Sequence, residues 1–183
     1  PDGVPKTLFI CDHAGREIPQ GYGDLGLPAS AFDRHIAFDI GAADLTRALA
    51  DAFDAPAVLG RYSRLFVDLN RGADDPTLIM KLSDGQIVPG NARADAAEFA
   101  KRIAMVHAPY HDAIAGQIAR GLALGHPPVL VSIHSFTPSW RGRPRPWHVA
   151  ILHAPRDRRL AELMLFELRA LPGLNVGDNE PYS

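Results

Sequence analysis

The stretch Pro127-Pro128-Val129-Leu130-Val131-Ser132-Ile133-His134-Ser135-Phe136 is a short, mainly apolar run that ends in a histidine. Prolines precede it and a polar, proline-bearing segment follows it, so the pattern predicts a buried central strand. His134 would then lie at the carboxyl end of that strand. Open α/β sheets bind their ligands at this end, because the loops that leave the strands form a crevice there.

A second predicted strand also ends in a histidine. Residues 6–11 form an apolar run that is followed by Asp12, His13 and a small-residue turn. Neutral imidazole is a common ligand for zinc and related metals, so two histidines at two strand ends indicate a metal site. The alternative is that each histidine merely caps its strand.

An acidic residue lies in the helix predicted after the first strand. Ser30 and Asp33 resemble a variant capping box, which predicts a helix from about residue 31 to about residue 53. Asp39 falls inside one apolar stripe of that helix, where an ionised carboxylate is costly unless something positive meets it. A second apolar stripe leaves open which face packs inward.

The remainder of the chain alternates predicted strands and helices. Residues 57–60 and 64–69 are strand candidates, and a polar cluster, Asp68-Leu69-Asn70-Arg71-Gly72, ends the second. We further expect a long loop over 74–91, a helix over 93–107 that Pro109 breaks or kinks and that resumes to about 122, a strand over 147–153 and a helix over 158–171. This alternation predicts a three-layer α/β/α domain with a mixed, mostly parallel sheet.

Length and composition narrow the class of protein. The 183 residues suit one domain with one substantial core, and a net charge of −2 gives no electrostatic footprint for nucleic acid or an anionic membrane. Cys11 is the single cysteine, so an internal disulfide is impossible. The sequence contains no apolar run of bilayer length, no secretion signal, no Walker-type loop and no dinucleotide fingerprint. We expect a cytoplasmic protein with a small-molecule partner; the sequence does not indicate an oligomeric state.

Two strand-end histidines with an acid on the intervening helix resemble the zinc amidases of the phosphorylase/hydrolase-like fold. In that fold a histidine near the first strand, an acid on the next helix and a histidine after a later strand bind the metal. The resemblance implies that His13, Asp39 and His134 bind one divalent cation, with Zn²⁺ as the expected metal and one position open for water. Glu17 is the rival third ligand, because it lies four residues after His13 in a predicted loop.

The match to one family extends through most of the chain. Five segments, in order, resemble the successive motifs of the N-formylglutamate amidohydrolase family: residues 11–19, 35–42, 63–71, 109–111 and 132–135. Membership implies hydrolysis of the amide bond of an N-acyl amino acid, N-formylglutamate in the founding members.

Two departures from the family pattern limit that transfer. Founding members carry Ser-x-Pro-His where this chain has Cys11-Asp12-His13, which is typical of an outlying branch whose substrate can differ. Family chains also usually continue beyond the region that resembles residues 177–182. We therefore expect one amidohydrolase-like domain over 1–183, with the alternative that its C-terminal portion is missing.

Further roles follow from this reading. We expect Arg71 to bind the substrate carboxylate through its planar fork, with Asn70 and Arg64 beside it. The arginines could instead have structural roles. Glu180 is the expected proton shuttle and His111 a second catalytic group, although His111 could simply bond to backbone and Glu180 could be a solvated residue.

Two competing functions stay open at this point. The same ligand set would serve a peptidoglycan amidase or carboxypeptidase, and a protein that kept the pocket without catalysis would bind a small molecule.

Overall fold

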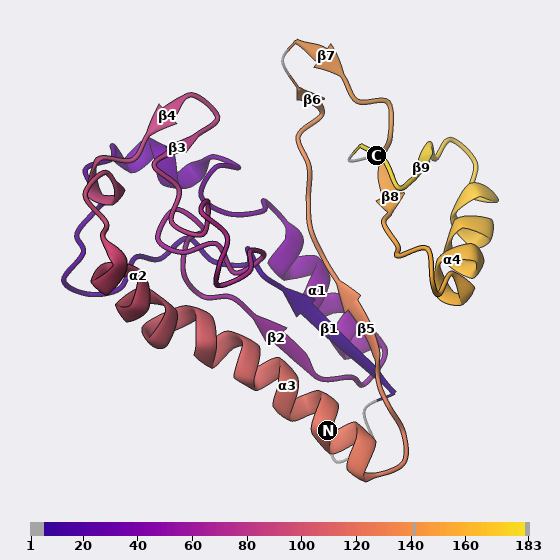
Figure 1. The fold of residues 1–183 in the computed structure, drawn as a ribbon. Coiled ribbons are helices and arrows are strands. Elements are labelled where there is room, and N and C mark those ends of the chain that lie inside the picture. The colour runs from indigo at the N-terminus through magenta and orange to yellow at the C-terminus, as the bar shows by residue number, and fades with distance from the viewer. Residues whose placement is uncertain (1–5, 141, 182–183) are drawn as a thin grey trace. The chain divides into compact units, whose positions relative to one another are not determined.

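The computed structural model describes residues 6–140 and 142–181 (Figure 1). The chain divides into two compact units, Pro1–Phe136 and Thr137–Ser183, and each is described by itself. The first unit contains β1 (Thr7–Cys11), η1 (Ala29–Asp33), α1 (Ala42–Ala52), β2 (Ala57–Leu59), β3 (Leu82–Ser83), β4 (Gln86–Ile87), η2 (Pro89–Asn91), α2 (Ala96–Arg102), η3 (Ile103–His107), α3 (Ala108–Ala123) and β5 (Val129–Ser132). The second unit contains β6 (Ser139–Trp140), β7 (Arg143–Pro144), β8 (Val149–Ile151), α4 (Arg159–Arg169) and β9 (Val176–Asp178). A single domain over 1–183 stays a prediction.

A three-stranded parallel sheet organises the first unit. Its order is β2-β1-β5, and Phe9 of β1 pairs with Ala57 on one side and Val131 on the other. Because both pairings are parallel, the carboxyl ends of β1 and β5 lie at the same edge of the sheet. This arrangement confirms a mixed α/β protein with parallel pairing; the three-layer arrangement stays a prediction.

The prediction that the strand before His134 is central in the sheet is wrong. β5 lies at an edge of the described sheet, and 46 % of Val129 and 47 % of Leu130 are exposed. The central strand is β1, in which every residue after Thr7 is buried. Both strands are continuous apolar runs, so their composition does not separate a central strand from an edge strand.

The helix predicted over 31–53 is wrong in its first half. The capping-box residues lie within η1, whose N-cap is Pro28 and lacks a side-chain cap, and α1 starts only at Ala42. Residues 34–41 separate the two elements, and the last of them, Gly41, is the N-cap of α1 with a φ of 79°, a conformation that glycine adopts without steric cost. Asp39 therefore lies in the turn before α1, and its N–H donates to the carbonyl of His13 at 2.9 Å.

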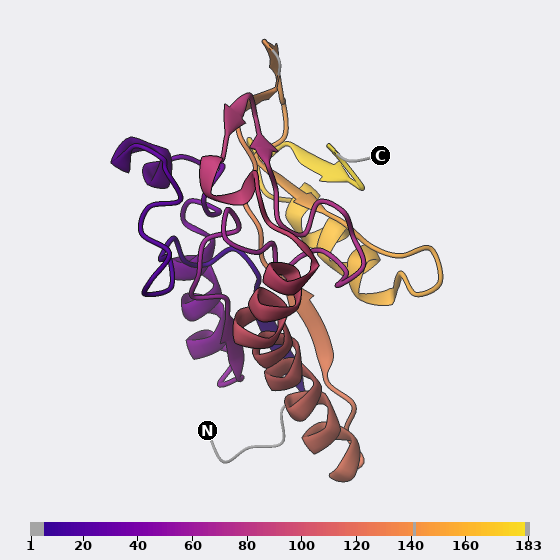
Figure 2. The ribbon, with the colours of Figure 1, turned by 60° about the vertical axis from the view of Figure 1, so that its left-hand side comes forward.

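The two segments that flank the polar cluster also differ from expectation. Residues 64–69 form turns and irregular backbone instead of a strand, and the long loop predicted over 74–91 contains the β3–β4 hairpin. Pro109 does not break the helix, since α2, the π-helical η3 and α3 follow one another without interruption. The proline lies in the first turn of α3, directly after the irregular π-helical turn. Figure 2 shows this helical stretch turned towards the viewer.

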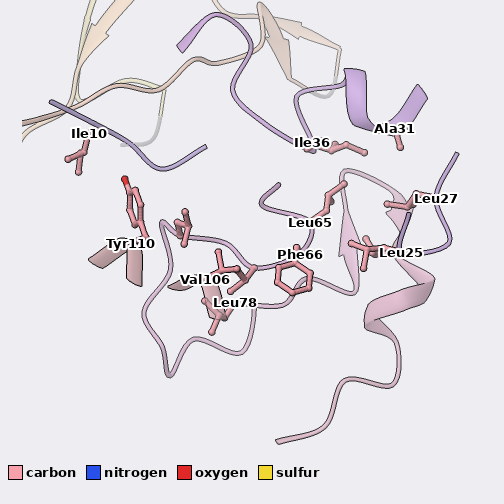
Figure 3. Packing of buried hydrophobic residues seen from close by; sticks show 14 of the residues in the cluster. Ile10, Leu25, Leu27, Ala31, Ile36, Leu65, Phe66, Leu78, Val106 and Tyr110 are labelled. Carbon is pink, nitrogen blue, oxygen red and sulfur yellow. The ribbon is translucent and has the colours of Figure 1, made fainter. Parts of the chain in front are cut away.

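The core of the first unit combines strand, helix and loop residues. Leu65, Phe66 and Val67 are fully buried although they belong to no strand. Figure 3 shows Leu65 and Phe66 among the side chains of the core cluster, with Val106 and Tyr110 contributed by the helical stretch. The apolar run over 65–69 is therefore buried, as its composition indicates, but the prediction that it forms a strand is wrong.

The second unit is small. β8 and β9 pair in parallel, β6 and β7 form a hairpin, and α4 contacts both β8 and β9. The strand predicted over 147–153 and the helix predicted over 158–171 are both present in shorter form. Among the described residues, helices of the length and apolarity that a bilayer crossing requires are absent.

Candidate metal centre

Three side chains that the sequence singled out meet at one point of the first unit. His13 follows β1, Asp39 precedes α1 and His134 follows β5, and one possible ligand atom from each lies within 4.8 Å of the others. Glu17 is engaged elsewhere, because its carboxylate pairs with Arg61 at 2.8 Å and is largely exposed. Of the two acids weighed as third ligand, Asp39 is the one in the cluster.

The two ring nitrogens of His13 have different environments. Nε2 donates a hydrogen bond to Asp68 Oδ1 at 2.6 Å. Nδ1 lies 3.5 Å from Asp39 Oδ1, is buried and has no hydrogen-bond partner among the described residues. When Nε2 carries the proton, the neutral ring directs the lone pair of Nδ1 towards an anionic carboxylate. Two acceptors face each other in this arrangement, which is unfavourable unless a cation lies between them.

His134 lies on the more open side of the cluster, with 31 % of its side chain exposed. Its Nδ1 is 2.8 Å from Asp39 Oδ2, and its Nε2 is 3.2 Å from Asp12 Oδ2 and 3.1 Å from Ser132 Oγ. The backbone N–H of Ser135 also donates to Asp39 Oδ2, at 3.3 Å. Asp39 is thus held between the two imidazoles.

Two further buried carboxylates surround this centre, and each is anchored by other groups. Asp68, which is 0 % exposed, accepts from Arg64 Nη2 at 2.9 Å and from the N–H of Asn70 at 2.9 Å. Asp12 accepts a 2.6 Å hydrogen bond from the hydroxyl of Tyr110. The structure therefore supplies hydrogen bonds that keep both carboxylates in place.

Hydrogen bonds and neighbouring charges outweigh burial in setting the pKa values of this centre. Burial would raise the pKa of Asp39 and Asp68. Hydrogen bonds from His13 and His134 outweigh burial at Asp39, so its pKa falls well below its usual range. At Asp68 the hydrogen bond from His13 and the charge of Arg64 lower the pKa to about 2. Burial would lower the pKa of His134, but its contacts with Asp12 and Asp39 raise that pKa to about 9. The pKa of His13 is likewise raised by Asp39 and Asp68 against the effect of burial.

These directions show how the site balances its charge. Asp12, Asp39 and Asp68 exceed the positive charge of Arg64 by two, and this excess of negative charge is what raises the pKa of both His13 and His134. A divalent cation would offset this excess and give the orphaned Nδ1 of His13 a partner. The two nitrogens and one carboxylate are also donors that zinc accepts in catalytic sites. The residues present therefore fit a metal ion.

The irregular segment that carries Arg64 and Asp68 is held by side chains. Among the residues that the structure describes, its backbone pairs with no strand, so its carbonyls need other donors. The bonds are Asn91 Nδ2 to Leu65 O at 2.7 Å, Arg102 Nη1 to Phe66 O at 2.8 Å, His111 Nε2 to Leu69 O at 3.1 Å and His107 Nε2 to Arg71 O at 2.8 Å. Four side chains thus replace a sheet partner.

The backbones around the first histidine pack closely. A Cβ added to Gly15 would lie 1.8 Å from the carbonyl oxygen of Arg61, and one added to Gly60 would lie 2.2 Å from that of Asp12. Only glycine allows such an approach. The turn after β1 therefore lies directly against the segment after β2.

Comparison with known proteins identifies the family. The family model for N-formylglutamate amidohydrolase matches residues 6–183. The chain belongs to the N-formylglutamate amidohydrolase family. The crystal structure of the gene product Atu2144 from Agrobacterium tumefaciens is similar, with 40 % sequence identity and a TM-score of 0.92 over 97 % of this chain and 70 % of that chain. A search of curated proteins found no match.

Family membership supports an amidohydrolase type of function. The structure also locates the other residues that the sequence predicted for the site. Arg64 contacts the centre through Asp68 and lies 3.6 Å from Asp39. Arg71 is 47 % exposed in its side chain and lies 3.9 Å from Asp75. His111 meets a backbone carbonyl, and Glu180 belongs to the second unit, where it is half-buried.

Sequence reasoning did not assign Asp12, Asp68 or Tyr110 to the site. Asp12 directly precedes the candidate ligand His13, and Asp68 opens the polar cluster over 68–72. Both positions are signals that the sequence offered. Tyr110 gave only a weak signal through its place in a family motif, because its partner Asp12 is 98 residues away.

Proposed function

We propose that this chain catalyses the metal-dependent hydrolysis of the amide bond of an N-acyl amino acid, such as N-formylglutamate. The observation that carries the proposal is the buried, unpartnered Nδ1 of His13, which faces Asp39 beside His134. Family membership supports an amide as the bond that is broken. The donor set favours zinc among divalent metals.

His13, Asp39 and His134 would hold the cation. When bound, it would polarise the amide carbonyl and lower the pKa of a water molecule, which are the standard metal contributions to hydrolysis. The partly exposed His134 marks the side of the centre that is open to solvent. Asp68 fixes the ring of His13, and Arg64 offsets part of the negative charge of Asp68 and Asp39.

The substrate carboxylate requires a cationic partner with free donors. Arg71 is the candidate, because its exposed guanidinium has, within the described part of the chain, only a long contact to Asp75 at 3.9 Å. Asn70 lies in the turn directly before Arg71 and can add an amide donor. Arg64 is committed to two carboxylates, so we assign it mainly to the charge balance of the centre, with substrate contact as its secondary role.

Proton transfer needs a group that takes a proton from water and returns it to the leaving amine. Glu180 remains our candidate for this role, on the strength of its place in the family pattern alone. His111 is the second candidate. Its Nε2 is occupied by Leu69 O, which leaves Nδ1 for chemistry, and burial together with nearby His107 lowers its pKa.

The test combines metal analysis with a substrate panel. Protein stripped with a chelator and reloaded with Zn²⁺ should release amine from N-formyl-L-glutamate or another N-acyl amino acid, whereas the stripped protein should not. His134→Ala should lose both the metal and the activity, and Glu180→Gln should lose activity with the metal retained. Equal turnover by stripped and reloaded protein would refute metal dependence, and an inert reloaded protein across the panel would refute the reaction.

A further inference from the structure

Asp12 is a buried carboxylate for which the reaction proposed above has no use. It is 6 % exposed and lies between the last residue of β1 and the candidate ligand His13. Burying a carboxylate is costly unless hydrogen bonds or a charge compensate it. Its two oxygens have separate partners, since Oδ1 accepts from the Tyr110 hydroxyl at 2.6 Å and Oδ2 lies 3.2 Å from His134 Nε2.

The ring of His134 is therefore bounded on both sides by carboxylates. Nδ1 is 2.8 Å from Asp39 Oδ2, and Nε2 faces Asp12. A neutral imidazole donates from one nitrogen and accepts at the other. With its proton on Nε2, directed at Asp12, the ring presents the lone pair of Nδ1 on the side where Asp39 and His13 converge.

The same arrangement exists at the other histidine. His13 directs Nε2 to Asp68 and Nδ1 towards Asp39, and Asp68 is anchored on its far side by Arg64. Asp12 is anchored on its far side by Tyr110 from α3. Each imidazole thus lies between Asp39 and an outer carboxylate that a third residue holds. Carboxylate partners of this kind orient metal-binding histidines and raise their basicity.

We propose that Asp12, held by Tyr110, is a positioning residue that fixes His134 with Nε2 protonated and Nδ1 turned towards Asp39. This inference rests on the proposed metal centre. Asp12 acts through His134 and has no direct role in bond cleavage. Tyr110 extends the arrangement to α3, so that the helix that holds the segment around Asp68 also sets the orientation of the second histidine.

Asp12→Asn is the decisive variant, because the amide keeps the shape of the carboxylate but removes the negative charge that faces Nε2. The Zn²⁺ dissociation constant, measured by competition with a chelator, should rise about 10- to 100-fold. In the Zn²⁺-loaded protein, ¹⁵N chemical shifts of the His134 ring should show Nδ1 bound to zinc and Nε2 protonated in the wild type, and this signature should weaken in Asp12→Asn because part of the rings would bind through Nε2 instead. Asp51→Asn, an exposed aspartate on α1, is the matched control and should change neither quantity.

Two more variants complete the design. Tyr110→Phe removes only the hydroxyl and should weaken Zn²⁺ binding in the same direction by a smaller factor. Ser132→Ala tests the other neighbour of Nε2, at 3.1 Å, and should leave the ring signature unchanged. Circular dichroism verifies that each variant folds, and should Asp12→Asn fail to fold, Tyr110→Phe decides.

The outcomes distinguish a failure of the role proposed for Asp12 from a failure of the proposed metal-dependent function. Suppose that the wild-type protein binds Zn²⁺ tightly and that Asp12→Asn has the same Zn²⁺ affinity and the same ring shifts. That result would overturn the role of Asp12 and leave the proposed metal centre intact. Loss of the ring signature in Ser132→Ala alone would assign the positioning to Ser132 and overturn the proposal. A wild-type protein that binds no divalent metal would overturn both.

Discussion

Arg102→Met tests how the segment that carries Arg64 and Asp68 is held. The Arg102 side chain is 2 % exposed, and its guanidinium donates to Phe66 O at 2.8 Å, to Asn91 Oδ1 at 2.7 Å and to a glutamate one turn earlier on α2. It also lies 4.4 Å from the centroid of the Phe66 ring. Methionine fills a similar space with a flexible apolar chain but has no donors to offer.

The magnitude follows from the two acceptors left behind. Phe66 O and Asn91 Oδ1 would both be buried without this donor, and each such loss costs about 1–3 kcal/mol. The sum is about 2–6 kcal/mol, a large part of the about 5–15 kcal/mol by which a typical domain is stable. For a chain of this size that corresponds to a fall in Tm of about 4–24 °C, at about 2–4 °C per kcal/mol.

Urea unfolding followed by circular dichroism measures the change, and calorimetry gives Tm independently. Arg120→Met is the matched control, because Arg120 lies on α3 with its side chain exposed and should change the free energy of unfolding by less than about 0.5 kcal/mol. A loss below about 1 kcal/mol in Arg102→Met would show that water or other donors replace the guanidinium. In that case the argument that four side chains substitute for a sheet partner would fail.

The other predictions concern a thiol, a glycine and the substrate. Burial raises the pKa of Cys11 to about 11, so the thiol stays protonated at pH 8 and should resist iodoacetamide until the protein is unfolded in urea; rapid labelling of the native protein would contradict this. Gly60→Ala should reduce stability and Zn²⁺ affinity because the new Cβ would meet the carbonyl of Asp12, whereas Gly116→Ala, with open space around it on α3, should stabilise by about 0.5–1 kcal/mol; equal Tm values for the two variants would contradict the close approach. Arg71→Lys should lower kcat/KM on an N-acyl amino acid because lysine lacks the planar fork, and unchanged kinetics would remove Arg71 from substrate binding.

The sequence allowed the two histidines to be placed together for a simple physical reason. Each follows a short apolar run, and parallel neighbours in one sheet bring their carboxyl ends to one edge, as β1 and β5 do. Asp39 shows the limit of such reasoning. The residue lies in the cluster, but the helix expected to carry it starts only at Ala42, after a glycine with positive φ. A periodic apolar pattern does not reveal where the backbone turns.

The environment of the site was harder to foresee. The run around Phe66 has the composition of a strand, yet its carbonyls are satisfied by side chains such as Asn91 and Arg102, which lie far along the chain. Hydrogen bonds from side chain to backbone over such separations depend on the finished fold and leave no periodic trace in the sequence. The same holds for Tyr110 and Asp12, which meet only once α3 has packed beside β1.

The π-helical segment η3 inserts one extra residue into the helical stretch from α2 to α3, and so changes the directions of the side chains that follow it. Each residue of a regular α-helix turns by about 100°, so positions five apart point in quite different directions. Ile103–His107 instead forms a wider turn, which aligns residues five apart and lets Arg102, His107 and His111 all reach carbonyls of one irregular segment. Removing a single residue from η3 would restore a regular helix while rotating both histidines away from their carbonyls. The length of this helix is therefore constrained to the residue, although nearly all of it lies outside the candidate metal centre.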